Sequence, residues 1–414
     1  MMGRYARLFA RRGTVPMTTA GVLARMPLSM VGVGVITMIA TTHGSYALAG
    51  TVAGVYALVT ALVTPQVARL VDRYGQRRVV LPVAVVSSLG LLALLTSSAL
   101  GGHESLLLAF AALAGVTPSA PALVRSRWSY LLKESDDVHT AYSWETVVDE
   151  VCFIVGPPVS IGLSVMLFPQ AGPILAGLLL LLGALWLVTQ RGTEPPVAVS
   201  KSESLLTRRA TGVLSTLTDR TVRTVVVVMV ALGVIIGTVD VVSVAFAEHQ
   251  GNVALASVVL SVYAVGSCLS GFVFGSRTLT RPIGGLLRVG MSATALATIP
   301  LLIVGDIAVL SATVFVAGLF FAPTMIMAAQ LIEKNVPSRS LTEALTWSTA
   351  GLGLGVALGP AIAGPLVDLH GASFGFWVAV GAGAVLLTMA LTTGASLRER
   401  PPGETPMRMP STSR

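Results

Sequence analysis

Residues 190–221 read QRGTEPPVAVSKSESLLTRRATGVLSTLTDRT and are the long polar stretch in the interior of the chain. Strongly apolar sequence lies on both sides of this stretch, and on each side it divides into six segments of roughly 20 residues. A helix of that length crosses about 30 Å of hydrocarbon, so each segment is long enough to span a bilayer. The polar stretch therefore predicts two halves of six spans each, joined by a linker.

The composition indicates that lipid surrounds these segments. The chain has 414 residues, of which 54% are hydrophobic and 11% are charged, whereas an ordinary soluble domain is about 25% charged. Too little polar surface remains to cover a globule of this size in water, which argues against a disordered chain, a disulfide scaffold or a cytosolic enzyme. The two cysteines, Cys152 and Cys268, fall inside predicted spans, and we expect them to be packing residues.

The apolar runs are continuous, which favours helices over the alternating segments of a membrane barrel. We therefore predict an all-α integral membrane protein in which twelve helices form two six-helix bundles. The spans expected from hydropathy are 17–41, 48–67, 79–100, 105–126, 143–168, 172–189, 222–247, 254–276, 283–304, 307–331, 344–368 and 373–394.

The basic residues predict the orientation of these spans. When both termini are placed on one side, that side receives all of the 27 Lys and Arg residues except Arg25, which lies within the first span. Such an excess is typical of cytoplasmic loops, so we expect a multi-pass protein of the inner (plasma) membrane with both termini in the cytoplasm. This bias also explains the net charge of +8. A nucleic-acid partner is not expected, because the sequence shows no basic face interleaved with aromatic residues.

The predicted division of the chain follows from spans and polar segments together. It consists of a cytoplasmic N-terminus, an N-terminal bundle, a cytoplasmic linker, a C-terminal bundle and a disordered cytoplasmic tail, at residues 1–16, 17–189, 190–221, 222–394 and 395–414. The two halves also repeat one another. Gly156-Pro157 in the fifth span corresponds to Gly359-Pro360 in the eleventh, and a tryptophan, Trp144 or Trp347, precedes each pair at the same distance. Paired six-helix repeats are the architecture of transporters whose substrate site lies between the halves.

The loop between the second and third spans carries a family resemblance. Residues 68–78 read ARLVDRYGQRR, which resembles the signature cytoplasmic loop of the major facilitator superfamily. Gly156-Pro157 resembles the glycine-proline motif of export members, whereas Ala112 stands where exporters carry an arginine in the fourth span. The pattern is most similar to bacterial drug and sugar efflux permeases of the arabinose-efflux-like group. The resemblance implies a monomer that works by alternating access.

The same loop has a chemistry suited to gating. Asp72 can accept hydrogen bonds from a helix N-terminus or from guanidinium groups across the boundary between the halves. Gly75 permits a tight turn, and Arg73, Arg77 and Arg78 can pair with acids or with anionic lipid headgroups. We expect a conformational latch, the alternative being a loop that only sets topology and anchors the protein to lipid.

Ionisable residues inside the predicted spans are the candidate functional residues. Arg25 in the first span lies at a depth similar to that of Glu145, Asp149 and Glu150 in the fifth, and we expect it to meet one or two of these carboxylates. One carboxylate would then neutralise Arg25, while another would carry a proton. The alternative is an inert buried ion pair. Asp240 in the seventh span is a candidate second proton site or a ligand for a cationic substrate, the alternative being a residue that only caps or hydrogen-bonds near an outer gate.

Two further arginines, Arg125 and Arg127, lie beside Trp128 at the inner end of the fourth span. We expect both of them to extend to the membrane surface, as arginines beside an aromatic belt do, rather than to form an anion-binding mouth.

The sequence lacks the HExxH, GxSxG, P-loop and CxxC patterns, so we expect no catalytic residues, cofactor or metal and no self-contained ATP-driven pump. The prediction is a secondary transporter for a small organic molecule, drug-like or sugar-like, exported in exchange for protons. The alternatives are proton-coupled nutrient uptake and, from another class, a membrane sensor or scaffold that does not transport. The expected partners are the substrate, protons and the lipid bilayer.

Overall fold

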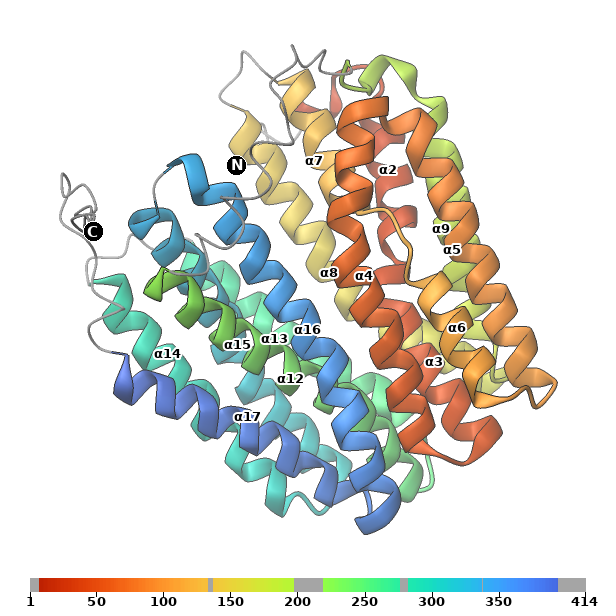
Figure 1. Ribbon diagram of the computed structural model, residues 1–414, viewed down its shortest axis with the longest axis vertical. Coiled ribbons are helices and arrows are strands. Elements are labelled where there is room, and N and C mark those ends of the chain that lie inside the picture. Colours follow the sequence, from red (N-terminus) through yellow and green to blue (C-terminus); the bar gives the residue numbers. More distant parts are fainter. Residues whose placement is uncertain (1–6, 133–136, 197–218, 276–281, 337, 394–414) are drawn as a thin grey trace, which may run out of the picture.

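The computed structural model describes residues 7–132, 137–196, 219–275, 282–336 and 338–393 (Figure 1). Residues 1–6 of the predicted N-terminus, residues 197–218 of the predicted linker and the predicted tail at 395–414 lie outside the described residues. Within the described part of the chain, all regular secondary structure is helical.

The first bundle runs from residue 14 to residue 189. Its helices are α2 (Thr14–Arg25), α3 (Pro27–His43), α4 (Tyr46–Tyr74), α5 (Gln76–Ala99), α6 (Glu104–Ala114), α7 (Ala120–Leu131), α8 (Val138–Met166) and α9 (Ala171–Thr189). A single turn of 3-10 helix, η1 (Arg191–Thr193), follows.

The second bundle runs from residue 220 to residue 392. Its elements are α12 (Arg220–His249), α13 (Leu255–Gly275), α14 (Ile283–Thr298), the 3-10 helix η2 (Ile299–Ile303), α15 (Ile307–Asn335), α16 (Ser338–His370) and α17 (Ala372–Thr392).

Eleven helices within the described residues are long and apolar enough to cross a membrane, counting α2 and α3 as one. The predicted fourth span differs, because Gly115 to Ser119 separate the short apolar helix α6 from α7. Pro118 in this segment removes a backbone donor and restricts the residue before it, which ends a helix. Pro27 accounts in the same way for the break between α2 and α3 at Met26. The all-helical membrane fold predicted from hydropathy is confirmed.

The two ends of the molecule differ in charge. The basic end carries the start of α2, the turn between α4 and α5, and η1, together with their arginines; the opposite end carries the α3–α4 and α16–α17 turns (Figure 1). Between the bundles, α4 packs along α16 and α8 packs along α13. These two helix pairs form the boundary that we call the seam.

Glycines bring the backbones of α4 and α16 into contact along the seam. A Cβ atom on Gly50 would lie 2.1 Å from the carbonyl oxygen of Pro360, and one on Gly364 would lie 2.2 Å from that of Tyr46. The contact continues toward mid-helix, where a Cβ on Gly353 would lie 2.5 Å from the Cβ of Ala61. Beyond this level the two helices diverge toward the basic end (Figure 1). The seam is therefore closed from the opposite end to about half its length.

Candidate functional site

Arg25 is the last residue of α2, and the helix break that follows it turns its guanidinium toward α8. Its Nε donates to the carbonyl oxygen of Gly21 at 3.2 Å, and one terminal nitrogen donates to the carbonyl of Glu145 at 3.3 Å. The side chain is 2% exposed. A charge buried to this degree requires an opposite charge and hydrogen-bond acceptors nearby.

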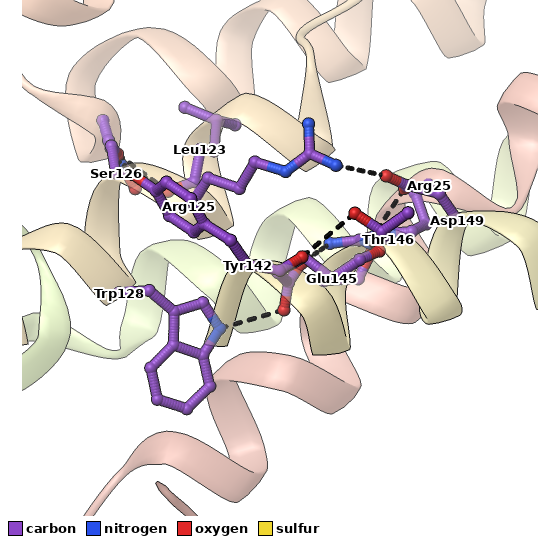
Figure 2. A network of polar contacts seen from close by, with 11 residues as sticks. Arg25, Leu123, Arg125, Ser126, Trp128, Tyr142, Glu145, Thr146 and Asp149 are labelled. Carbon is purple, nitrogen blue, oxygen red and sulfur yellow. Dashed lines mark hydrogen bonds and ion pairs between the residues drawn. The ribbon is translucent and has the colours of Figure 1, made fainter. Parts of the chain in front are cut away.

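Both kinds of partner come from α8 (Figure 2). The terminal nitrogen that donates to the carbonyl of Glu145 also lies 3.0 Å from Oδ1 of Asp149, and the other terminal nitrogen forms an ion pair with the carboxylate of Glu145. Glu145 is completely buried, and its second oxygen accepts the indole N–H of Trp128 at 2.9 Å. The sequence predicted one or two carboxylates of the fifth span against Arg25, and these are the two that the structure places there.

Asp149 differs from Glu145 because it is shared between two cations. Its Oδ2 accepts a hydrogen bond from Arg125 of α7 at 2.7 Å (Figure 2). Its side chain is 24% exposed, and that of Arg125 is 39% exposed. We call these four residues, Arg25, Arg125, Glu145 and Asp149, the charge cluster. It joins α2, α7 and α8, and its two positive and two negative charges balance.

Glu150 and Asp240 lie outside this balance. Both side chains are half-buried in the apolar part of the molecule. Among the described residues, neither has a hydrogen bond or an ion pair. Tyr263 of α13 is close enough to both carboxylates to interact with them electrostatically. The structure therefore adds a tyrosine that the sequence did not single out, within electrostatic range of two acids that the sequence placed on separate spans.

The prediction for Arg127 was wrong. Its side chain has no exposed surface, and the guanidinium does not extend to the membrane surface. It donates to Oε1 of Gln76 at 2.7 Å, to the hydroxyl of Thr193 at 2.7 Å, and to the backbone carbonyls of Leu187 and Gln190. The C-terminal carbonyls of α9 attract a cation, so the end of a neighbouring helix holds the charge that was expected to reach lipid headgroups. Arg125 is paired with Asp149, as described above.

The candidate gating loop lies at the basic end. Gly75 has φ 89° and ψ 155°, a conformation suited to glycine, and it separates α4 from α5. The Arg73 guanidinium lies over the ring of Tyr74, with 5.2 Å to its centroid. The backbone N–H of Arg77 donates to Glu194 at 2.9 Å. Asp72 is exposed and has no hydrogen bond or ion pair within the described residues. The latch therefore stays a prediction.

The opposite end holds contacts between the bundles that the sequence did not predict. The carboxylate of Asp368, at the end of α16, accepts hydrogen bonds from the hydroxyl of Ser45 and the backbone N–H groups of Tyr46 and Ala47, at 2.9, 2.8 and 2.8 Å. The Tyr46 hydroxyl donates to Glu248 of α12. Acids near span ends are ordinary interfacial residues in a sequence, so no signal distinguished Asp368 or Glu248.

The two glycine-proline pairs pack helices within each bundle. A Cβ on Gly156 would lie 2.0 Å from the hydroxyl oxygen of Ser29 in α3, and one on Gly359 would lie 2.6 Å from the carbonyl of Val234 in α12. Pro157 and Pro360 lie inside α8 and α16. The repeat seen in the sequence thus corresponds to the same close helix contact in both bundles.

Two helical bundles that meet along a partly closed seam, with buried charges in the membrane interior, define the class of secondary transporters. The family model described as Major Facilitator Superfamily matches residues 17–309 and 237–411. The chain therefore belongs to the major facilitator superfamily, and it is a transporter of small molecules rather than an enzyme. No curated protein sequence matches the chain.

Solved structures share the fold at low sequence identity. A structure of the nucleoside transporter NupG is 15% identical, with a TM-score of 0.71, and the match covers 93% of this chain and 99% of that chain. A bacterial homologue of the human lysosomal transporter Spinster, in an inward-facing and unoccupied conformation, is 14% identical with a TM-score of 0.69, covering 94% and 98%. A peptide-bound POT family transporter is 14% identical with a TM-score of 0.67, covering 92% and 95%.

Proposed function

We propose that this superfamily member exports a small organic molecule in exchange for protons across the inner (plasma) membrane, with the basic end in the cytoplasm. The excess of arginine at that end supports the orientation. Gly156-Pro157, similar to the motif of export members, supports the direction. We further propose that the two bundles, at 17–189 and 222–394, rock about the seam as a monomer to expose the substrate site alternately.

Glu150 is the observation that carries the proton-coupling proposal. The charge cluster already compensates Arg25 with Glu145 and Asp149, so Glu150 stays in the membrane interior without a counter-ion among the described residues. An isolated carboxylate there costs a few kcal/mol as an anion, and binding a proton removes that charge. Since Glu150 is only half-buried, a proton can reach it from one side of the membrane and leave toward the other after the bundles rock.

The closed half of the seam supports alternating access. The bundles touch from the opposite end to the level of Gly353 and Ala61, while Asp72 at the basic end has no partner within the described residues. Under the proposed orientation this form opens toward the cytoplasm. A sensor or scaffold with the same fold has no need for uncompensated charge in the membrane, which makes transport the better explanation of Glu150.

Accumulation in cells tests the proposal. Cells with and without the protein are loaded with a labelled panel of sugars, nucleosides, amino acids and cationic dyes, in the presence and absence of a protonophore. Export predicts that the protein lowers accumulation of at least one compound and that the protonophore restores it. Higher accumulation with the protein reverses the direction and makes nutrient uptake the function. No change with any compound contradicts transport by this protein.

The proton role of Glu150 has its own variants. We expect Glu150→Gln to abolish the protonophore-sensitive part of transport without loss of expression, because glutamine keeps the shape of the side chain but cannot exchange a proton. Glu104→Gln is the matched control, since Glu104 is an exposed carboxylate in the first turn of α6. Normal proton-driven transport by Glu150→Gln contradicts the assignment. Asp149→Asn, which also removes a candidate carrier, is compared in the same assay.

A further inference from the structure

A hydrogen bond between the bundles fixes the relative heights of α8 and α13. The hydroxyl of Ser261 donates to the backbone carbonyl of Ile154 at 2.8 Å. Glu150 lies one helical turn from Ile154, about 6 Å toward the basic end, and Tyr263 lies two residues from Ser261, about 3 Å in the same direction. Glu150 and Tyr263 therefore lie at nearly the same depth, on neighbouring helices of the two bundles.

Asp240 reaches this level from α12. It lies nine residues before the end of α12 at His249, and Tyr263 lies eight residues after the start of α13 at Leu255. The two helices are antiparallel neighbours, so these positions lie about 13 Å and about 12 Å from the opposite end. Tyr263 interacts electrostatically with both Asp240 and Glu150. Three polar side chains from three helices thus lie at a similar depth, within the closed half of the seam, since Gly237 of α12 packs against Pro360 of α16 just before this level.

The hydroxyl of Tyr263 is an unsatisfied group at this place. Its oxygen is buried and has no hydrogen-bond partner in the described part of the chain, although a buried hydroxyl without a partner costs about 1–3 kcal/mol. Its ring packs at a tilt against the ring of Phe321 in α15, with 6.1 Å between centroids. A polar ligand that binds beside Tyr263 would satisfy the hydroxyl, and the aromatic face there attracts a cation.

The charge at this level has one sign. Arg25, in the membrane interior, is compensated by Glu145 and Asp149, and Arg125 is paired with Asp149. The arginines and lysines of α12, α13 and α15 are Arg220, Arg223 and Lys334, which lie within a few residues of the helix ends at the basic end. An anionic substrate would be repelled here, and a neutral one would leave two carboxylates uncompensated in a poorly hydrated space.

We propose that Asp240, Glu150 and Tyr263 form a binding site for an organic cation, so that the substrate of this transporter carries a positively charged amine or a comparable onium group. The proposal rests on the proposed function and names its substrate class. The cation and the proton use the same carboxylates, and binding of one positive charge releases one proton. This competition couples the outward movement of the substrate to the inward movement of protons without leaving charge uncompensated in the membrane.

Binding to the purified full-length protein tests the site directly. The probes are tetraphenylphosphonium and ethidium, two organic cations, and triphenylphosphine oxide, a neutral compound of similar shape to the first. We expect saturable binding of at least one cation by equilibrium dialysis, with an affinity about tenfold or more above that of the neutral compound. We also expect proton release into a weakly buffered solution upon binding, and weaker binding as the pH falls.

Variants locate the site. Asp240→Asn is expected to weaken cation binding about tenfold or more, and Tyr263→Phe, which removes only the hydroxyl, about threefold to tenfold. Glu104→Gln, the exposed carboxylate of α6, should leave the affinity unchanged. Size-exclusion profiles and melting temperatures show that each variant is folded. Three results would overturn the proposal. The first is that Asp240→Asn binds the cations as tightly as the unchanged protein does. The others are that the neutral compound binds as tightly as the cations, or that no cation binds saturably.

The two proposals fail in different ways. Cation binding that depends on Asp240, in a protein that shows no proton-driven transport, contradicts the proposed function and leaves the binding site intact. Proton-driven export of neutral or anionic compounds alone, with no cation bound, contradicts the substrate class and leaves the transport function intact.

Discussion

The carboxylate of Asp368, at the end of α16, accepts a hydrogen bond from the backbone N–H of Tyr46, the first residue of α4, at 2.8 Å. The first N–H groups of a helix have no partner within it and are usually capped by a side chain from just before the helix. Ser45 supplies that ordinary cap to α4. Asp368 adds a second cap from the other bundle, so part of the stability of α4 depends on closure of the seam.

Asp368→Asn should weaken closure at the opposite end. A charged cap at a helix N-terminus contributes about 1 kcal/mol, which corresponds to roughly a fivefold shift toward the form that is open at that end. A cysteine replacing Ala361, whose Cβ faces Gly54 across the seam, reports this form through its rate of alkylation. The rate is measured in a background with Cys152 and Cys268 replaced by serine.

Asp306→Asn is the matched control for Asp368→Asn. Asp306 caps the N-terminus of its own helix, α15, by accepting from the N–H of Val309 at 2.8 Å, so its loss removes a similar cap within one bundle. We expect no change in alkylation at position 361. Equal effects of the two substitutions would show that Asp368 has no specific role at the seam.

Gly50→Ala should prevent closure more completely than loss of the cap. The new Cβ would overlap the carbonyl oxygen of Pro360 at 2.1 Å, and backbone atoms on both sides leave little freedom to adjust. Alkylation at position 361 is expected to rise about tenfold or more, because overpacking of this kind costs about 1–3 kcal/mol. Gly162→Ala in α8 is the control, since nothing lies within 4 Å of its added Cβ. Unchanged alkylation in Gly50→Ala argues against a closed seam.

Asp72→Asn should change the rate of alkylation at position 361 in the opposite direction to Asp368→Asn. Asp72 is exposed in this form and has no partner within the described residues, so its loss cannot destabilise the form seen here. If the loop is a latch for the other form, alkylation at position 361 falls and transport slows. A rise in alkylation would exclude the latch and leave membrane anchoring as the role of the loop.

Arg25→Met should destabilise the first bundle strongly. The substitution leaves Glu145 fully buried without its ion-pair partner, and breaking a buried pair from one side costs about 3–5 kcal/mol. Thermal unfolding in detergent measures the loss. The double variant Arg25→Met with Glu145→Met should recover a large part of it, because no uncompensated charge remains. If the double variant is as unstable as the single one, the ion pair stabilises the fold through its hydrogen bonds and packing and not only by balancing charge.

Arg127→Lys should lower the melting temperature, although it conserves the charge. Arg127 is fully buried and donates to four acceptors on Gln76, Thr193, Leu187 and Gln190, and an ammonium group cannot reproduce that planar set of donors. We expect a loss of about 2–3 kcal/mol. Arg125→Lys, at a half-exposed ion pair, should cost less than about 1 kcal/mol. Similar losses in both variants would contradict this account.

Features that depend only on position along the chain could be predicted from the sequence alone. Span length and the side of each loop follow from hydropathy and from the positions of arginines, and the shared depth of Arg25 and the acids of the fifth span follows from a constant rise per residue. These features need no knowledge of how the helices pack.

Helix rotation and lateral packing required the folded molecule. Successive helical residues differ by about 100°, so a small rotation of α8 decides that Asp149 pairs with Arg25 while its neighbour Glu150 stays unpaired. The burial of Arg127, the cap that Asp368 provides to α4 and the approach of Tyr263 to Asp240 likewise join residues far apart in the chain. Such contacts depend on the combined fit of many side chains on several helices, and neither hydropathy nor spacing within one helix contains that information.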